Sequence, residues 1–155
     1  MTHLNPLVTT LNAQGRKCSR YLVQIQFGDC DPAGIVFFPN FNKWMDAASL
    51  HFFMSCGVPP WRELLKTTGI IGTPLLEINT RFLKPATYGE TITVETCVLE
   101  WGRKTMKQQH TVLRNDAGVE TVLCIGTETR AFCVMQGDVL KAIPVPADIL
   151  ALCSS

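Results

Sequence analysis

The sequence predicts an α+β domain in which one long helix is wrapped by a curved antiparallel sheet. Two observations lead to this prediction. Apolar residues recur at helical spacing only once over a long stretch, at residues 39–57, whereas period-two alternation recurs through most of the chain that follows. Because one helix cannot cover both faces of a large sheet, we expect the sheet to curl around it.

The composition indicates one globular domain. The chain has 155 residues, of which 46% are apolar and 17% charged, so it is long enough to bury a core. A net charge of +1 gives no reason to expect binding to nucleic acid or to a membrane surface. Seven cysteines without a CxxC pair or a secretory signal predict reduced thiols in a cytoplasmic protein. No apolar run approaches the roughly 20 residues of a membrane span.

The first elements are an extension and a strand. Residues 1–17 show no sustained period and are predicted to be a loosely held extension, so the domain itself covers 18–155. A strand with one apolar face is predicted over 21–27, where apolar and polar positions alternate. It is ended by the glycines and proline of "GDCDPAG", residues 28–34.

The long helix is predicted over residues 39–57, with Gly57 as its C-terminal stop. Its helically spaced apolar residues are Phe41, Trp44, Met45, Ala48 and Phe52. Few polar positions interrupt this segment, so we expect the helix to be buried. A short second helix is predicted in "PWRELLKTTG", with Pro60 as its opening residue.

Strands account for most of the remaining chain. They are predicted over 74–85, 90–101, 104–114 and 119–135, with a hairpin turn at "NDAG", and the chain ends in a turn, a short strand and a helical turn. A buried helix inside a curled antiparallel sheet is the hot-dog fold. Its uncovered sheet face favours an oligomer.

The segment "FGDCDPAGIVFFPNF", residues 27–41, is the first candidate for chemistry. Its only close metal-ligand types are Asp29, Cys30 and Asp31, which alternate in direction if extended, and no histidine pair has ligand spacing, so no metal site is predicted. Cys30 has no local base, and two flanking carboxylates disfavour its thiolate, so it is interpreted as a packed residue. Motifs of serine hydrolases and nucleotide-binding loops are absent.

The role of Asp31 stays open on residue chemistry alone. It could be a turn residue or helix cap, with Pro32 in the first helical position. It could equally be a catalytic carboxylate, placed beside backbone N–H groups at a helix start that would stabilise an oxyanion.

Other polar side chains in apolar or basic settings are candidates for binding. Asp46, on the apolar helix, is either a solvated position or a pocket residue that accepts a hydrogen bond from a substrate hydroxyl. Trp61 is interpreted as packing or a pocket wall. Arg103 and Lys104 in "WGRKTMK" either guard a solvated strand edge or anchor phosphates.

Several motifs together resemble the 4-hydroxybenzoyl-CoA thioesterase family of hot-dog enzymes. The likeness begins with "GDCDPAGIV", continues through "PN" and the helical "W.DAAS", and extends through "TVETC" and "EWGRK" to "AIPVPADILALC". It therefore covers nearly everything from about residue 20 to the end of the chain.

The resemblance implies roles for particular residues. Asp31 would be the catalytic carboxylate, acting as nucleophile or as general base, and the backbone N–H of Phe38 would polarise the thioester oxygen. Asp46 and Trp61 match residues that border the aromatic acyl pocket. The resemblance also implies that Arg103 and Lys104 hold the phosphates of coenzyme A, that no cofactor or metal is needed, and that the enzyme is a homotetramer built from hot-dog dimers.

Two departures from the family bear on specificity. This chain has Phe37 and Phe38 where the family enzyme has Trp-Tyr, which makes the substrate-binding wall at Phe37 more apolar. Gly102 replaces a basic residue before Arg103, which removes one expected phosphate contact. The leading interpretation is hydrolysis of 4-hydroxybenzoyl-CoA or a close benzoyl analogue. The alternatives are a thioesterase for other aromatic or aliphatic acyl groups and a non-catalytic acyl-CoA binding module.

Overall fold

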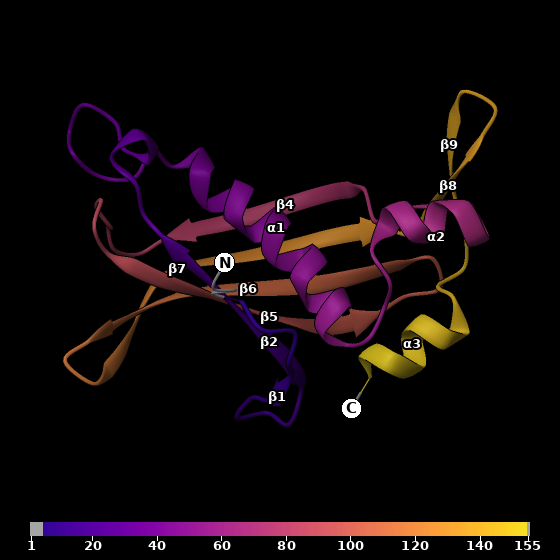
Figure 1. Ribbon diagram of the computed structural model, residues 1–155, viewed down its shortest axis with the longest axis horizontal. Helices are drawn as coiled ribbons and strands as arrows, with labels where there is room; N and C mark the ends of the chain where they lie inside the picture. Colours follow the sequence, from indigo (N-terminus) through magenta and orange to yellow (C-terminus); the bar gives the residue numbers. More distant parts are fainter. Residues whose placement is uncertain (1–4, 155) are drawn as a thin grey trace.

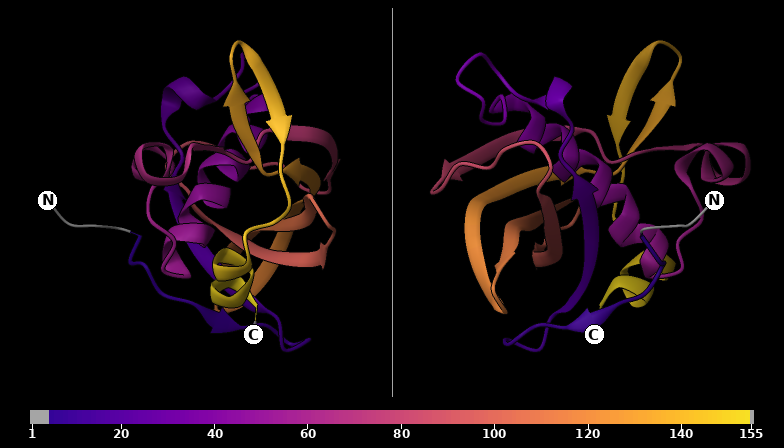
Figure 2. Two further views of the ribbon diagram at one scale, coloured as in Figure 1. Left: turned by 90° about the vertical axis from the view of Figure 1, so that its right-hand side faces the viewer. Right: turned by 60° about the vertical axis from the view of Figure 1, so that its left-hand side comes forward.

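The computed structural model describes residues 5–154, and it confirms a helix wrapped by a curved antiparallel sheet. Helix α1 (Pro39–Ser55) runs across six strands in the order β1-β2-β5-β6-β7-β4, and the sheet curls around it (Figures 1 and 2). All neighbouring strands are antiparallel. These strands are β1 (Thr10–Leu11), β2 (Lys17–Gln24), β4 (Leu75–Phe82), β5 (Thr91–Trp101), β6 (Thr105–Asp116) and β7 (Val119–Ala131).

A second, smaller sheet lies beyond the first. It has the order β3-β8-β9, and its β8–β9 hairpin projects away from the body of the molecule (Figure 2). Its strands are β3 (Ile70–Gly72), β8 (Cys133–Gln136) and β9 (Val139–Ala142); the remaining helices are α2 (Trp61–Thr68), α3 (Ala147–Cys153) and the 3-10 turn Phe27–Asp29. No helix within residues 5–154 is both long and apolar enough to cross a membrane.

The predicted strand over 119–135 is wrong in one respect, because it is two strands in different sheets. The break falls at Phe132, whose N–H donates to the carbonyl of Lys104 (3.1 Å) and whose carbonyl accepts from Ile143 (2.8 Å). Its ring is fully buried against Phe53. The chain therefore leaves the main sheet at this residue and starts the projecting hairpin.

The N-terminal strand also differs from its predicted bounds. β2 begins at Lys17 and ends at Gln24, and Phe27 lies exposed in the 3-10 turn, not in a strand. The expected loose extension covers residues 1–17, of which 1–4 lie outside the described residues. In the described part, β1 pairs with β2, and the carbonyl of Pro6 lies 3.2 Å from Nε2 of His51.

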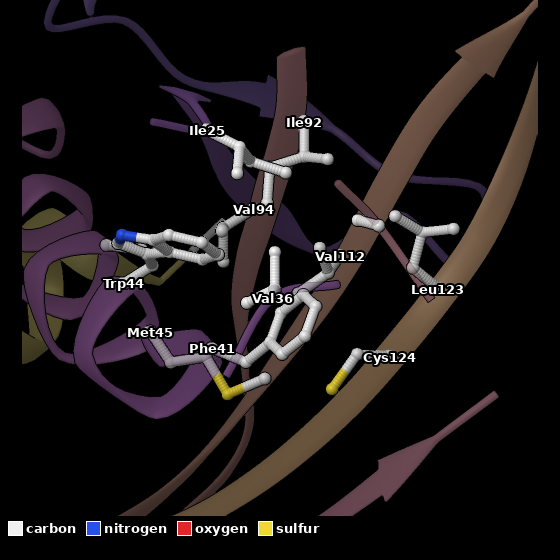
Figure 3. Packing of buried hydrophobic residues seen from close by; sticks show 12 residues of the cluster. Ile25, Val36, Phe41, Trp44, Met45, Ile92, Val94, Val112, Leu123 and Cys124 are labelled. Atoms are coloured by element: carbon white, nitrogen blue, oxygen red, sulfur yellow. The ribbon is translucent and has the colours of Figure 1, made fainter. Parts of the chain in front are cut away.

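The core lies between α1 and the concave face of the sheet. Figure 3 shows Trp44, Met45 and Phe41 of α1 directed toward apolar side chains of the strands, which include Ile92, Val94, Val112, Leu123 and Cys124. Gly126 of β7 lies directly against the buried side chain of Met45 on α1. A Cβ at Gly126 would lie 2.4 Å from Sδ of Met45, so a side chain there would displace the helix methionine.

β4 is a free edge of the main sheet. Among the described residues it pairs with β7 alone. The apolar face that predicted it is largely uncovered in this chain: Leu76 is 61% exposed and Ile78 is exposed, while Phe82 is half-exposed although its ring lies 5.9 Å from that of Phe41. A strand that leaves both apolar side chains and backbone hydrogen-bonding groups uncovered is a surface suited to pairing with another chain.

Candidate active site

The first part of the candidate site is the segment 27–38, here called the Asp31 loop, which leads into α1. Cys30 and Val36 form an antiparallel bridge, and the N–H of Asp31 donates to the carbonyl of Ile35 (2.9 Å). The intervening turn closes because Gly34 adopts a left-handed conformation (φ 82°), which glycine enters without a steric penalty. The loop is thus a short, hydrogen-bonded hairpin.

Asp31 caps the turn of this hairpin. Its Oδ1 accepts the N–H of Ala33 (2.9 Å), while Oδ2 has no hydrogen-bond partner among the described residues. The alternative in which Asp31 caps the long helix, with Pro32 as its first residue, is wrong, because α1 begins at Pro39. The physical reason is the hairpin itself, which turns the chain back before the helix starts. Asp31 is therefore a half-buried carboxylate with one oxygen available.

Asp29 supports the backbone of the same loop. Its Oδ2 accepts the N–H of Gln26 (2.8 Å), and its carbonyl accepts the N–H of Phe37 (2.9 Å) and Nδ2 of Asn40 (2.8 Å). These bonds tie the 3-10 turn to the first turn of α1. Cys30 is partly buried against the core, which agrees with its interpretation as a packed residue.

Phe38 presents a free backbone N–H where α1 begins. It has helical backbone angles (φ −53°, ψ −35°), and its N–H has no acceptor within residues 5–154. The N-terminal end of a helix carries partial positive charge, so this N–H suits an anionic oxygen. The exposed rings of Phe37 and Phe38 lie 5.4 Å apart, and Phe38 also borders an apolar hollow of about 260 Å³ with Phe41 and Phe82.

The second part of the candidate site is a hollow of about 310 Å³ farther along α1, here called the Asp46 hollow. It brings together Asp46 and Trp61, which the sequence analysis had selected separately, and adds Arg130 from β7. The indole of Trp61 packs 5.0 Å from the ring of Phe53, so it is both a packing residue and a pocket wall. A Cβ at Gly72 would come within 3.3 Å of this indole, so glycine there leaves room for it.

Sequence reasoning missed the buried polar groups behind this hollow. Arg130 bonds Asp46 Oδ1 (Nη2, 2.9 Å) and Glu128 Oε2 (Nε, 2.7 Å), and Glu128 Oε1 lies 2.8 Å from Nε2 of His110. Nδ1 of His110 lies 2.7 Å from Oγ1 of Thr96. Burial alone would raise the pKa of Glu128, but His110 and Arg130 together lower it. We call Thr96, His110, Glu128 and Arg130 the Arg130 network.

A signal for this network was present in the sequence. Glu128 and Arg130 are separated by one residue, so they share a face of β7, and that strand is otherwise rich in apolar and small residues. Charged pairs on a buried face are uncommon and mark either structural ion pairs or functional groups.

Arg103 and Lys104 lie in the turn between β5 and β6. Their carbonyls accept the N–H groups of Val145 (2.8 Å) and Phe132 (3.1 Å), which fixes the turn. Neither side chain has a carboxylate partner among the described residues. A Cβ at Gly102 would lie 2.7 Å from Oγ1 of Thr105, so a larger residue there would require that hydroxyl to move.

Within one chain, the Asp31 loop is separated both from the Asp46 hollow and from the basic β5–β6 turn. Asp46 follows Phe38 by eight residues, which is about 12 Å along a helix. The β5–β6 turn lies at the end of the sheet opposite to the Asp31 loop (Figure 1). The single chain therefore brings Asp31 and Phe38 onto one loop and Asp46 and Trp61 into one hollow, but it does not join these pairs, and the basic turn lies far from the Asp31 loop.

Comparison with known proteins identifies the class. A family model described as the thioesterase-like superfamily matches residues 25–152, and the chain therefore belongs to this family. Within it, the chain is 48% identical over 132 residues to the 4-hydroxybenzoyl-CoA thioesterase of Pseudomonas sp. (strain CBS-3), covering 84% of this chain and 94% of that protein.

Solved structures agree with both the fold and this grouping. A mutant 4-hydroxybenzoyl-CoA thioesterase in complex with 4-hydroxybenzoyl-CoA has a TM-score of 0.86 at 43% identity, covering 88% of this chain and 99% of that one. A gentisyl-coenzyme A thioesterase has a TM-score of 0.73 at 31% identity, covering 84% and 98% respectively.

Proposed function

We propose that this protein hydrolyses the thioester of an aromatic acyl-CoA, with 4-hydroxybenzoyl-CoA or a close benzoyl analogue as substrate. The observation that carries the proposal is the presence, on one loop, of the Asp31 carboxylate and the Phe38 backbone N–H; within residues 5–154, Oδ2 of the first has no donor and the second has no acceptor. These are the two groups that attack on an acyl carbon requires, a nucleophile or base and an oxyanion donor. The high identity to a thioesterase of this specificity supports the same reaction.

In the proposed mechanism, the thioester oxygen accepts a hydrogen bond from the N–H of Phe38. Oδ2 of Asp31 attacks the carbonyl carbon, the carbon–sulfur bond breaks, and coenzyme A leaves as its thiolate. Water then attacks the resulting mixed anhydride, which releases the aromatic acid and restores the Asp31 carboxylate. In the less direct version, Asp31 instead takes a proton from the attacking water.

Binding of the substrate is assigned to the remaining residues. Asp46 and Trp61 border the hollow proposed to take the aromatic ring. Phe37, exposed beside Phe38 on the Asp31 loop, is proposed as an apolar wall for the substrate. Arg103 and Lys104, which have no carboxylate partner among the described residues, are proposed to meet the phosphates of coenzyme A. No cofactor or metal is proposed, because a thiolate is a good leaving group and needs no strong acid catalyst.

We propose that the complete site forms between copies of this chain, in a homotetramer built from dimers. Two observations support this. The Asp31 loop and the basic turn lie at opposite ends of the sheet within one chain (Figure 1), and the edge strand β4 exposes both its backbone and apolar side chains such as Leu76. Pairing of two β4 edges would extend the sheet and cover these side chains.

A reducing compartment, the cytoplasm, is proposed for this reaction. All seven cysteines are free, and five of them are buried. Buried free thiols behave as small apolar packing residues, and such a set is typical of proteins kept under reducing conditions.

The decisive experiment is Asp31→Asn. Asparagine keeps an Oδ1 that accepts the N–H of Ala33, so the turn survives while the nucleophile or base is lost. We expect kcat for 4-hydroxybenzoyl-CoA, followed by thiol release, to fall by roughly 10²–10⁴-fold. Asp29→Asn is the matched control, since it changes a carboxylate on the same loop that supports the backbone. If Asp31→Asn hydrolyses the substrate within a few-fold of wild type, Asp31 is only a turn cap and the proposal fails.

A substrate panel separates the proposal from its alternatives. The kcat/KM values for 4-hydroxybenzoyl-, benzoyl- and medium-chain acyl-CoA should fall in that order. Equal values would favour the broader thioesterase, for which the apolar Phe37–Phe38 pair is the supporting feature. Stoichiometric acyl-CoA binding without thiol release would favour the binding module.

A further inference from the structure

We propose that Arg130 is a positioning residue for substrate selection, which holds the Asp46 carboxylate in the orientation that accepts a hydrogen bond from a ring hydroxyl. This inference rests on the proposed function, and it assigns a role to the Arg130 network that the reaction chemistry itself does not require.

Arg130 is held from several sides at once. Its Nε bonds Glu128, its Nη1 donates to the carbonyl of Thr73 (3.0 Å), and its Nη2 reaches both Glu128 and Asp46. The side chain is only 6% exposed, whereas that of Asp46 is 73% exposed. A planar guanidinium fixed by three other bonds leaves little freedom in the direction of the fourth.

The groups behind Arg130 continue into the interior. Glu128 and His110 are fully buried, and Thr96 ends the series on β5. Because Nε2 of His110 faces a carboxylate oxygen, we assign the proton to Nε2, so that Nδ1 accepts from the hydroxyl of Thr96. Thr96 thereby orients His110, which lies in close contact with Glu128, and Glu128 holds the guanidinium of Arg130 that bonds Oδ1 of Asp46.

The free-energy cost of burying the charges of Glu128 and Arg130 argues for a role of the Arg130 network other than stabilising the fold. A buried ion pair gains little over apolar residues of similar size, because both charges lose their hydration. Here the series ends at a carboxylate on the rim of a hollow, not at a closed internal pair. A polar network of this kind, running from the core to a pocket, is typical of groups that orient a binding residue.

The consequence for Asp46 follows from its two oxygens. Oδ1 is occupied by Arg130, while Oδ2 has no partner among the described residues and remains free at the Asp46 hollow. An exposed aspartate on a helix would otherwise sample several rotamers. With Oδ1 held, Oδ2 is presented in one direction as an acceptor. A ring that carries a hydroxyl gains this hydrogen bond, and an unsubstituted ring leaves the carboxylate without it.

The test measures discrimination, defined as the ratio of kcat/KM for 4-hydroxybenzoyl-CoA to that for benzoyl-CoA. Glu128→Gln combined with Arg130→Met removes both buried charges together, so neither is left unpaired. Arg130→Lys is the conservative variant, which keeps the positive charge but loses the planar guanidinium that bonds several partners at once. Arg20→Gln is the matched control, an arginine on the same sheet whose partners, Glu95 and Glu120, lie outside the Asp46 hollow.

We expect the charge-neutral double variant to lose discrimination on the order of tenfold, with benzoyl-CoA hydrolysis changed by no more than a few-fold. Arg130→Lys should lose part of it, and the control should lose none. In an Asp46→Ala background, the double variant should cause no further loss, because Arg130 acts through Asp46.

Other outcomes overturn the inference. A purely structural role would lower kcat/KM equally for both substrates and leave discrimination unchanged. If the double variant does not fold, Arg130→Lys serves in its place. Unchanged discrimination between the two substrates in folded Arg130→Lys would likewise indicate a purely structural role. Wild-type protein that hydrolyses both substrates equally would refute this inference alone. Wild-type protein that hydrolyses neither would refute the proposed function and this inference with it.

Discussion

Replacement of Phe38 by proline tests the oxyanion contact without removing any other hydrogen bond. The N–H of Asn40 donates to the carbonyl of Phe37 (2.9 Å), so residues 37–40 form a turn with Phe38 in its second position. The angles of Phe38 (φ −53°, ψ −35°) match the type I turn position that favours proline. Since the Phe38 N–H has no acceptor within the described residues, proline removes the proposed donor without breaking another backbone hydrogen bond.

The expected loss of kcat follows from the proline-compatible backbone angles of Phe38 and from its N–H group, which has no acceptor within the described residues. A proline at a compatible backbone position changes stability by about 1 kcal/mol or less. Loss of one oxyanion donor costs about 10²–10³-fold in kcat, or roughly 3–4 kcal/mol in the transition state. The ring of Phe38 is lost as well, including its contact with Phe82 at 6.0 Å, so this effect must be measured separately.

The assay compares Phe38→Pro with Phe38→Ala, which loses the same ring but keeps the N–H. We expect kcat for thiol release to be about 10²–10³-fold lower in the proline variant than in the alanine variant. Thermal unfolding should show similar stability for the two. If both variants are folded and their kcat values agree within a few-fold, the N–H of Phe38 does not stabilise the transition state and the reasoning is refuted.

Three further predictions concern packing, pH and thiol reactivity. Gly126→Val should lower stability by about 1–3 kcal/mol in denaturant unfolding, because its side chain meets the methionine of α1; an unchanged midpoint would contradict this. Burial lowers the pKa of His51 in the folded state. The stability contributed by the neutral imidazole is therefore complete above pH 6.5 and is lost as the pH falls through the lowered folded-state pKa. The free energy of unfolding of His51→Gln should depend less steeply on pH in this range, and an unchanged pH dependence would contradict this. Burial raises the pKa of Cys124 to about 12, whereas a hydrogen bond from Cys153 lowers that of Cys56, so iodoacetamide at pH 8 should label Cys56 before Cys124, and equal rates would contradict this.

Local patterns predicted the long helix and most of the strands, and a specific motif pointed to the family. The helical spacing of Phe41, Trp44 and Met45 predicted α1, since burial on one side of a helix imposes that period. Buried alternation likewise predicted β5, and Ile92 and Val94 do face the core. The position of Asp31 in a specific motif indicated the family, which the comparisons confirm.

Properties that depend on distant residues needed the tertiary structure. β4 lies last in the spatial order of the main sheet, although it precedes β5 in the chain. The order of the strands depends on which strand edges pair, and the periodicity within one strand does not reveal it. The two-residue strand β1 is too short to carry any periodic signal, and it exists because β2 provides an edge. The break at Phe132 depends on backbone partners far away in the sequence.

The candidate site also combines residues that are close in sequence with contacts between residues that are far apart in it. Asp31 and Phe38 are close in sequence, so one short hydrogen-bonded loop carries both. Asp46 and Arg130 are 84 residues apart, and only the packing of α1 against β7 brings their charges together. Local sequence encodes period and turn chemistry, but a contact across the core depends on the packing of whole elements, which no short segment contains.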